Sequence, residues 1–143
     1  MNSIRRQILI ASASCAIAAP LGAADRFLDP QVAFRFSTRR IDARTVELRW
    51  AIAPGYYMYR KWFKFAVEGA EIAAPVLPPA ERKFDENFGE ELEIYKVEVV
   101  VPLVLTSVPA GAFTIKAVGQ GCAEGGLCYP PQNFTARIDA VRT

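Results

Sequence analysis

Two cysteines near the carboxyl end of the chain are the residues best suited to chemistry. Cys122 and Cys128 have five residues between them, and Gly125-Gly126 in the middle supplies the positive-φ freedom that lets a chain reverse direction. This spacing can close a disulfide across a tight loop or hairpin, provided that the Cβ vectors allow it. The sequence contains no histidine, so mechanisms and metal sites that depend on an imidazole are excluded.

The spacing of the two cysteines leaves three uses of the pair open. A structural disulfide that closes a loop of about seven residues would stabilise the fold by only about 2.4 kcal/mol on the chain-entropy formula. A redox-active pair on a short, glycine-rich hairpin would instead present a sulfur to an incoming thiolate. A metal site fits least well, because two thiolates without an imidazole leave a tetrahedral site half empty.

Alternating apolar residues predict that the cysteine hairpin is carried by strands. Val46, Leu48, Trp50 and Ile52 alternate with polar or small residues, which puts one apolar row on one face of an extended strand. Shorter alternations occupy residues 32–36, 63–67, 113–117 and 134–138, and a Val-rich segment runs from Leu92 to Val101. Proline and glycine pairs separate these segments, so we predict an all-β fold, an antiparallel β-sandwich of about six or seven short strands.

The first 24 residues have the order of a secretory signal peptide. A basic start precedes an apolar run over residues 8–19, and small residues follow before the polar Asp25. The run is shorter than the roughly 20 residues that a membrane span needs. We therefore expect residues 1–24 to be cleaved and residues 25–143 to form the exported domain, in a compartment where the cysteine pair can oxidise.

Composition and charge describe one folded domain without a phosphate-binding surface. The 143 residues are 52% hydrophobic and 22% charged, which is enough apolar surface to build a core. Cleavage would remove Arg5 and Arg6, so Lys and Arg would fall from 17 to 15, against 15 Asp and Glu. A neutral domain is a poor ligand for nucleic acid or anionic lipid. The apolar segment 97–105 is too short to cross a bilayer, so we expect no membrane insertion after cleavage.

Three motifs follow one another along the exported part of the chain. They are Gly55-Tyr-Tyr-Met-Tyr-Arg60, then Asp85-Glu-Asn-Phe-Gly89 with Glu93-Ile-Tyr95, and finally Gln120-Gly-Cys-Ala-Glu-Gly-Gly-Leu-Cys-Tyr-Pro-Pro131. Together they resemble the N-terminal periplasmic domain of the thiol:disulfide interchange protein DsbD family, over roughly residues 27–139. The resemblance implies an immunoglobulin-like β-sandwich in the periplasm of a Gram-negative bacterium, with a redox-active cysteine pair and no cofactor beyond it.

The resemblance also implies partners. In the family, the domain takes electrons from a thioredoxin-like domain served by a membrane electron-transfer reductase. It passes them to periplasmic thioredoxin-like proteins such as disulfide isomerases and cytochrome c maturation thioredoxins. Carried over to this chain, Cys128 forms the mixed disulfide with a partner and Cys122 resolves it.

Further site residues come from the same motifs. Asp85 and Glu86 resemble the acidic pair beside the family's cysteines, where a carboxylate could move protons or oppose thiolate formation; a solvated loop end is the other interpretation. Asn87 stands at the position of the family's aromatic cap over the disulfide, with Phe88 next to it, so either residue could cap the site.

Three tyrosines complete the expected lining of the disulfide. Tyr57 and Tyr59 match family tyrosines that line the site, although alternating tyrosines can equally form half-buried core. Tyr129, directly after the second cysteine, is added to this lining.

Two questions of function stay open on the sequence. Full members of the family continue into a transmembrane domain and a thioredoxin-like domain, so this chain is either a free-standing relay subunit or a fragment. The alternative functions are a non-enzymatic β-sandwich binding module with a structural disulfide, and a metal carrier or scaffold.

Overall fold

A computed structural model describes residues 26–142 and shows an antiparallel all-β fold, as the alternation predicts. The predicted signal peptide, residues 1–24, lies outside the described residues. The strands are β1 (Phe34–Arg40), β2 (Thr45–Ile52), β3 (Tyr56–Tyr59), β4 (Lys64–Glu68), β5 (Glu81–Asp85), β6 (Glu90–Tyr95), β7 (Glu98–Val104), β8 (Phe113–Gly119), β9 (Gly121–Ala123) and β10 (Gln132–Ile138). A single turn of helix, α1 (Pro30–Ala33), precedes β1, and another, η2 (Arg60–Trp62), lies between β3 and β4.

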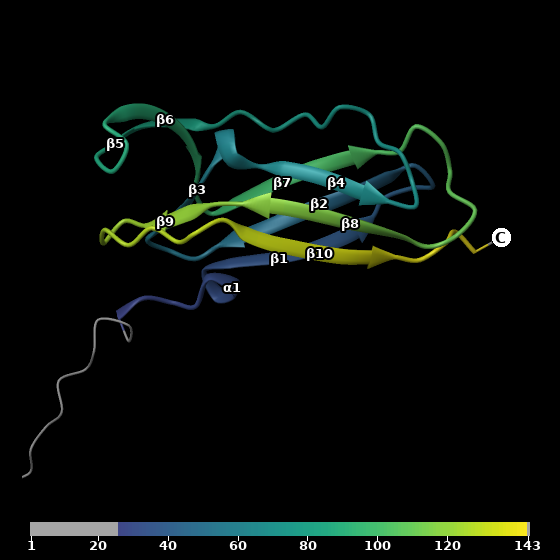
Figure 1. The fold of residues 1–143 in the computed structure, drawn as a ribbon, viewed down its shortest axis with the longest axis horizontal. Helices are drawn as coiled ribbons and strands as arrows, with labels where there is room; N and C mark the ends of the chain where they lie inside the picture. Colours follow the sequence, from purple (N-terminus) through teal and green to yellow (C-terminus); the bar gives the residue numbers. More distant parts are fainter. Residues whose placement is uncertain (1–25, 143) are drawn as a thin grey trace, which may run out of the picture.

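Two three-stranded sheets form the sandwich. One has the order β1-β2-β7 and the other β10-β8-β4; the strands of both run along the length of the molecule (Figure 1), and side chains of the two sheets pack against each other. Trp50 of β2 fills the space between the sheets, with its ring centroid 5.6 Å from that of Phe134 and 5.0 Å from that of Phe63. Because Trp50 has no exposed surface, this aromatic cluster is the centre of the main core.

The strand that was clearest in the sequence forms as predicted. In β2, the side chains of Val46, Leu48, Trp50 and Ile52 are buried, and the residues between them face outward. On that outer face Glu47 accepts hydrogen bonds from Arg39 of the neighbouring strand β1 and from Arg49 of β2, so the charged row pairs on the solvent side of the sheet.

The Val-rich segment from Leu92 to Val101 does not form one continuous strand. It divides into β6 and β7, which belong to different sheets, and Val97 between them has a φ of 68°. The carbonyl of Lys96 accepts a hydrogen bond from the N–H of Glu98, which closes a tight turn around Val97. The described residues therefore form ten strands, more than the predicted number, and Val32 lies in α1 rather than in a strand.

A third sheet, with the order β5-β6-β3-β9, covers one end of the sandwich (Figure 1). β9 follows β8 after a single residue, Gln120, so the chain passes from the sandwich into this end sheet almost without interruption. Alternate residues of β3 belong to different clusters: Tyr56 and Met58 pack in the main core, whereas Tyr57 and Tyr59 pack with Cys122. The end sheet thus has one structural face and one face that carries the cysteines.

Candidate redox site

The two cysteines form a disulfide across a tight hairpin. The Sγ atoms of Cys122 and Cys128 are 2.10 Å apart, and the two residues face each other as an antiparallel bridge. The turn is closed by a hydrogen bond of 3.0 Å from the N–H of Gly126 to the carbonyl of Ala123. Gly126 has a φ of 105°, which an L side chain rarely adopts, so glycine is required there. The expected hairpin is confirmed.

The two sulfurs differ in access. Cys122 at the centre of β9 has no exposed surface, while Cys128 is half-buried. Gly121 allows this arrangement, because a Cβ atom at that position would collide with the carbonyl of Tyr57 and the ring of Phe34. The close approach of β9 to β3 buries the first sulfur and leaves the second as the one that another protein can reach.

A tyrosine connects the buried sulfur to a buried carboxylate. The hydroxyl oxygen of Tyr59 lies 3.0 Å from Cys122 Sγ and 4.0 Å from Cys128 Sγ. The same hydroxyl donates a hydrogen bond of 2.5 Å to Oδ2 of Asp85, a residue that is only 1% exposed. Tyr57 reaches the same carboxylate oxygen at 3.4 Å, so its contribution is weaker.

The hydrogen bonds of this network fix the charge of its members. Burial by itself raises the pKa of Asp85, but the hydrogen bonds from Tyr59 and from the backbone N–H groups of Asn87 and Phe88 outweigh burial and hold that pKa below its ordinary value. Burial raises the pKa of Tyr59, and the hydrogen bond to Asp85 raises it further. At neutral pH Asp85 is therefore a carboxylate and Tyr59 a neutral phenol.

An aromatic wall stands beside the disulfide. The ring of Trp62 lies edge-on to that of Tyr59 at 4.5 Å, and Phe88 contacts both, at 4.9 Å from Trp62 and 5.7 Å from Tyr59. Phe88 is 46% exposed and Asn87 is exposed, so both stand on the solvent side of the site. The Nδ2 of Asn87 donates a hydrogen bond of 3.4 Å to Cys128 Sγ. The polar residue at the cap position thus contacts the sulfur, and the ring next to it extends the wall.

The structure brings most of the predicted site residues together but separates two of them. Tyr57, Tyr59, Asp85, Asn87 and Phe88 gather around the two cysteines. Glu86 is exposed, and its side chain makes no hydrogen bond or ion pair with the described residues.

Tyr129 belongs to the main core rather than to the wall around the sulfurs. Its ring lies 5.6 Å from that of Phe34 and stacks on Tyr56 at 6.3 Å. Its hydroxyl donates to the carbonyl of Leu28, while the hydroxyl of Tyr56 accepts from the N–H of Leu28. The physical reason is the alternation of side chains: Cys128 turns toward the site, so the residue after it turns toward the core.

Two neighbours of the site were not predicted from the sequence. Trp62 follows Tyr59 by three residues and is the last residue of η2. This turn of helix brings the Trp62 ring back against the ring of Tyr59. Lys83 of β5 holds its ammonium group 4.9 Å from the centre of the Tyr57 ring. The only signal for Lys83 was its position two residues before Asp85, which places both on one face if the segment is a strand.

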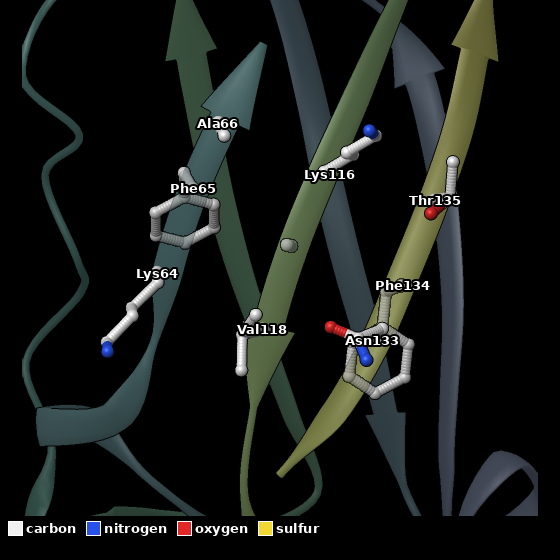
Figure 2. Close-up of a pocket in the computed structure, with 9 residues that line it drawn as sticks. Lys64, Phe65, Ala66, Lys116, Val118, Asn133, Phe134 and Thr135 are labelled. Atoms are coloured by element: carbon white, nitrogen blue, oxygen red, sulfur yellow. The ribbon is translucent and has the colours of Figure 1, made fainter.

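A hollow lies on the β10-β8-β4 sheet, away from the cysteine hairpin. It has a volume of about 280 Å³, and Lys64, Lys116 and Asn133 are among the residues around it (Figure 2). Within residues 26–142, no helix is long and apolar enough to cross a membrane. In the same part of the chain, no three histidine, cysteine, aspartate or glutamate residues gather closely enough to hold a metal ion.

Comparison with known proteins agrees with this site. The family model described as "Thiol:disulfide interchange protein DsbD, N-terminal" matches residues 24–140. The chain belongs to the DsbD N-terminal family. The thiol:disulfide interchange protein DsbD of Ralstonia nicotianae is 42% identical over 134 residues, which are 92% of this chain and 22% of that protein. DsbD 2 of Pseudomonas aeruginosa is 46% identical over 117 residues, 80% of this chain and 19% of that protein. The chain spans about a fifth of the length of these DsbD relatives.

Solved structures of DsbD N-terminal domains share the fold. The reduced domain from Neisseria meningitidis superposes with a TM-score of 0.74 at 30% identity, over 83% of this chain and 94% of that chain. The same organism's complex of the DsbD and PilB N-terminal domains gives a TM-score of 0.66 at 30% identity, over 77% of this chain and 85% of that chain. The predicted immunoglobulin-like antiparallel β-sandwich is confirmed, as is the resemblance to the DsbD family.

Proposed function

We propose that this domain is a thiol:disulfide interchange relay of the periplasm. It accepts electrons from a thioredoxin-like domain served by a membrane reductase, and it reduces disulfides of periplasmic thioredoxin-like proteins. Disulfide isomerases and cytochrome c maturation thioredoxins are the partner classes. The whole DsbD relatives are about five times longer than this chain, so the membrane step belongs to a segment or subunit beyond residues 26–142.

One observation carries the proposal: the disulfide joins a buried sulfur to a half-buried one, and the buried sulfur contacts a tyrosine that is hydrogen-bonded to a carboxylate. A disulfide that serves only to hold a fold together needs no such network. An interchange site needs both parts, because one sulfur must bond to the partner and the other must resolve that bond.

The reaction proceeds through a mixed disulfide. The Cys128 thiolate attacks one sulfur of the partner's disulfide, an S–S bond forms between the proteins, and the partner's other sulfur leaves as a thiolate. Cys122 then attacks Cys128 Sγ, which breaks the bond between the proteins and releases the partner's second sulfur as a thiolate. The partner has then gained two electrons, and the domain holds the disulfide. The Cys122 proton passes to the oxygen of Tyr59 as the Tyr59 proton passes to Oδ2 of Asp85.

Trapping with single-cysteine variants tests these roles. The variants are Cys122→Ala and Cys128→Ala in a Cys15→Ser background, so that no third thiol takes part. Each variant, in its reduced form, is mixed with a cytochrome c maturation thioredoxin that lacks its resolving cysteine and whose remaining cysteine is activated as a mixed disulfide with thionitrobenzoate, which leaves as the thiolate when the domain's sulfur attacks. The variant that retains Cys128 should capture the partner as a mixed disulfide on a non-reducing gel. Capture by the Cys122 thiol alone would reverse the assigned roles.

A redox titration separates the relay from a binding module with a structural disulfide. A relay should equilibrate with thioredoxin-like proteins, whose potentials lie at about −270 to −120 mV, whereas a structural disulfide has a potential below about −300 mV. A Cys122→Ser, Cys128→Ser variant that supports full electron delivery in cells would refute the relay.

The compartment is tested separately. Export predicts that the periplasmic fraction contains a chain that begins at Asp25, which mass spectrometry of the intact protein would detect.

A further inference from the structure

The two sulfurs have hydrogen-bonding neighbours of opposite kind. Tyr59 lies 3.0 Å from Cys122 Sγ, but its proton is donated to Asp85, so its oxygen faces this sulfur with lone pairs. Cys128 Sγ instead meets the Nδ2 of Asn87 at 3.4 Å. An amide NH₂ is a donor and accepts nothing, so the second sulfur faces a proton and the first faces an acceptor.

The turn that carries Asn87 is held in place by the same carboxylate. Oδ1 of Asp85 accepts hydrogen bonds from the backbone N–H groups of Asn87 at 2.9 Å and Phe88 at 3.2 Å. The N–H of Gly89, at a φ of 66°, donates to the Asp85 carbonyl at 2.7 Å. One carboxylate therefore fixes both neighbours: Oδ2 holds the tyrosine beside Cys122, and Oδ1 holds the turn beside Cys128.

These contacts act differently on a thiolate and on a thiol. A hydrogen bond to the charged form favours ionisation, so a donor beside Cys128 favours its thiolate. An acceptor beside Cys122 is satisfied by the S–H proton and favours its thiol. Interchange needs this difference, because the sulfur that attacks the partner must be the thiolate while the resolving sulfur stays protonated until its turn.

We infer that Asn87 is a catalytic residue whose side-chain amide donates to the Cys128 sulfur and selects that sulfur to carry the negative charge during interchange. The inference rests on the proposed function, which it deepens by naming what distinguishes the two sulfurs. It differs from the expected role of a cap, because a cap excludes reagents by its bulk, whereas Asn87 acts through its amide protons.

Charged and titratable groups from two strands also face this site, and one exposed carboxylate lies beside it in the sequence. Asp85 and Lys83 come from β5, Tyr57 and Tyr59 from β3, and Glu86 precedes Asn87 in the turn. All of them remain when Asn87 alone is replaced. A change in the behaviour of Cys128 between such variants therefore reports the amide, not the fixed charges around it.

The test follows the alkylation of Cys128 by iodoacetamide across pH. The parent is the chain with Cys15→Ser and Cys122→Ser, in which Cys128 is the single thiol. Asn87→Leu keeps the size of the side chain and removes the donor, and Asn87→Gln keeps an amide. Asn133→Leu, the same change at an exposed residue of β10 away from the cysteine hairpin, is the matched control. Circular dichroism in the near ultraviolet confirms that each variant retains the packing of the parent.

We expect Asn87→Leu to move the midpoint of the pH profile upward by about one unit, which is about a tenfold loss of thiolate at a pH below the midpoint. Asn87→Gln should recover part of that shift, and Asn133→Leu should match the parent. If the pH profile of the Asn87→Leu variant superposes on that of the parent, the inference is overturned. The inference is also overturned if Asn87→Leu and Asn87→Gln shift the midpoint of the pH profile equally, because the shape of the side chain rather than its donor would then be the cause.

Failure of the inference and failure of the proposed function are distinguishable. The disulfide form of the chain with both Cys122 and Cys128 is assayed with a reduced thioredoxin-like protein. Interchange with an unshifted Asn87→Leu profile removes only the role of Asn87. Absence of interchange removes the proposed function, whatever the alkylation profile gives.

Discussion

Removing the hydroxyl of Tyr59 should destabilise the domain through Asp85. In Tyr59→Phe the buried carboxylate loses its shortest hydrogen bond, the one of 2.5 Å, and keeps two backbone donors and the distant Tyr57 hydroxyl. A hydrogen bond to a charged group contributes about 1.5–3 kcal/mol, so we expect the free energy of unfolding to fall by about 2 kcal/mol at pH 7. Tyr57→Phe, which removes a contact of 3.4 Å to the same oxygen, is the matched control and should cost about 0.5 kcal/mol or less.

The effect should disappear in acid. The folded-state pKa of Asp85 lies below its ordinary value, so ionisation of this carboxyl stabilises the fold above the unfolded pKa of about 3.9. That contribution is lost as the pH falls through the folded pKa. The difference between Tyr59→Phe and the parent should therefore be largest near neutral pH and should shrink in acid.

Urea unfolding, followed by circular dichroism, measures the interaction energy between Tyr59 and Asp85 in a double-mutant cycle of Tyr59→Phe with Asp85→Asn. If the tyrosine acts through the carboxylate, the two single changes should be less than additive by about 1–2 kcal/mol. Energies that add to within about 0.5 kcal/mol at pH 7 would show that the hydroxyl and the carboxylate stabilise the fold independently. The reasoning about the network would then be wrong.

Three further predictions concern separate parts of the molecule. Phe88→Ala should raise the rate at which dithiothreitol reduces the disulfide, because a half-exposed part of the wall is removed; an unchanged rate would remove Phe88 from a capping role. Tyr129→Phe should lower the free energy of unfolding in urea by about 1 kcal/mol, through loss of the hydrogen bond to Leu28, and should leave the interchange rate unchanged. Val97→Gly should raise the free energy of unfolding by about 0.5–1 kcal/mol, because relief of a positive φ at an exposed β-branched residue exceeds the entropy that glycine adds to the unfolded chain. A lower free energy of unfolding in that variant would contradict the strain at Val97.

The sequence predicted the sandwich where the hydrophobic period was regular. The buried row around Trp50 alternates without exception, and only a strand produces that pattern. The hairpin was equally predictable, because the five residues between Cys122 and Cys128 suffice only for a short turn that contains two glycines. In both places the information is local.

The sequence could not show features that depend on pairing between distant segments. β5 has charged residues on both faces, and its identity as a strand comes from its register with β6, in which Lys83 faces Leu92. The break at Val97 carries neither glycine nor proline, so nothing local marks it. The contact of Tyr59 with Asp85 joins β3 to β5, which do not pair directly but both pair with β6. Such a contact follows from the sheet order and not from either motif.

The alternation within β3 sets how freely this domain can be redesigned. Substitutions at Tyr57 and Tyr59 would change the surroundings of the disulfide, and at Tyr59 they would also lower the stability of the fold, while the side chains of Tyr56 and Met58 pack only in the main core. A combinatorial library should therefore randomise every second codon of the strand. A single inserted codon would exchange the two sets and ruin both properties at once, since the side chains change sides with every residue.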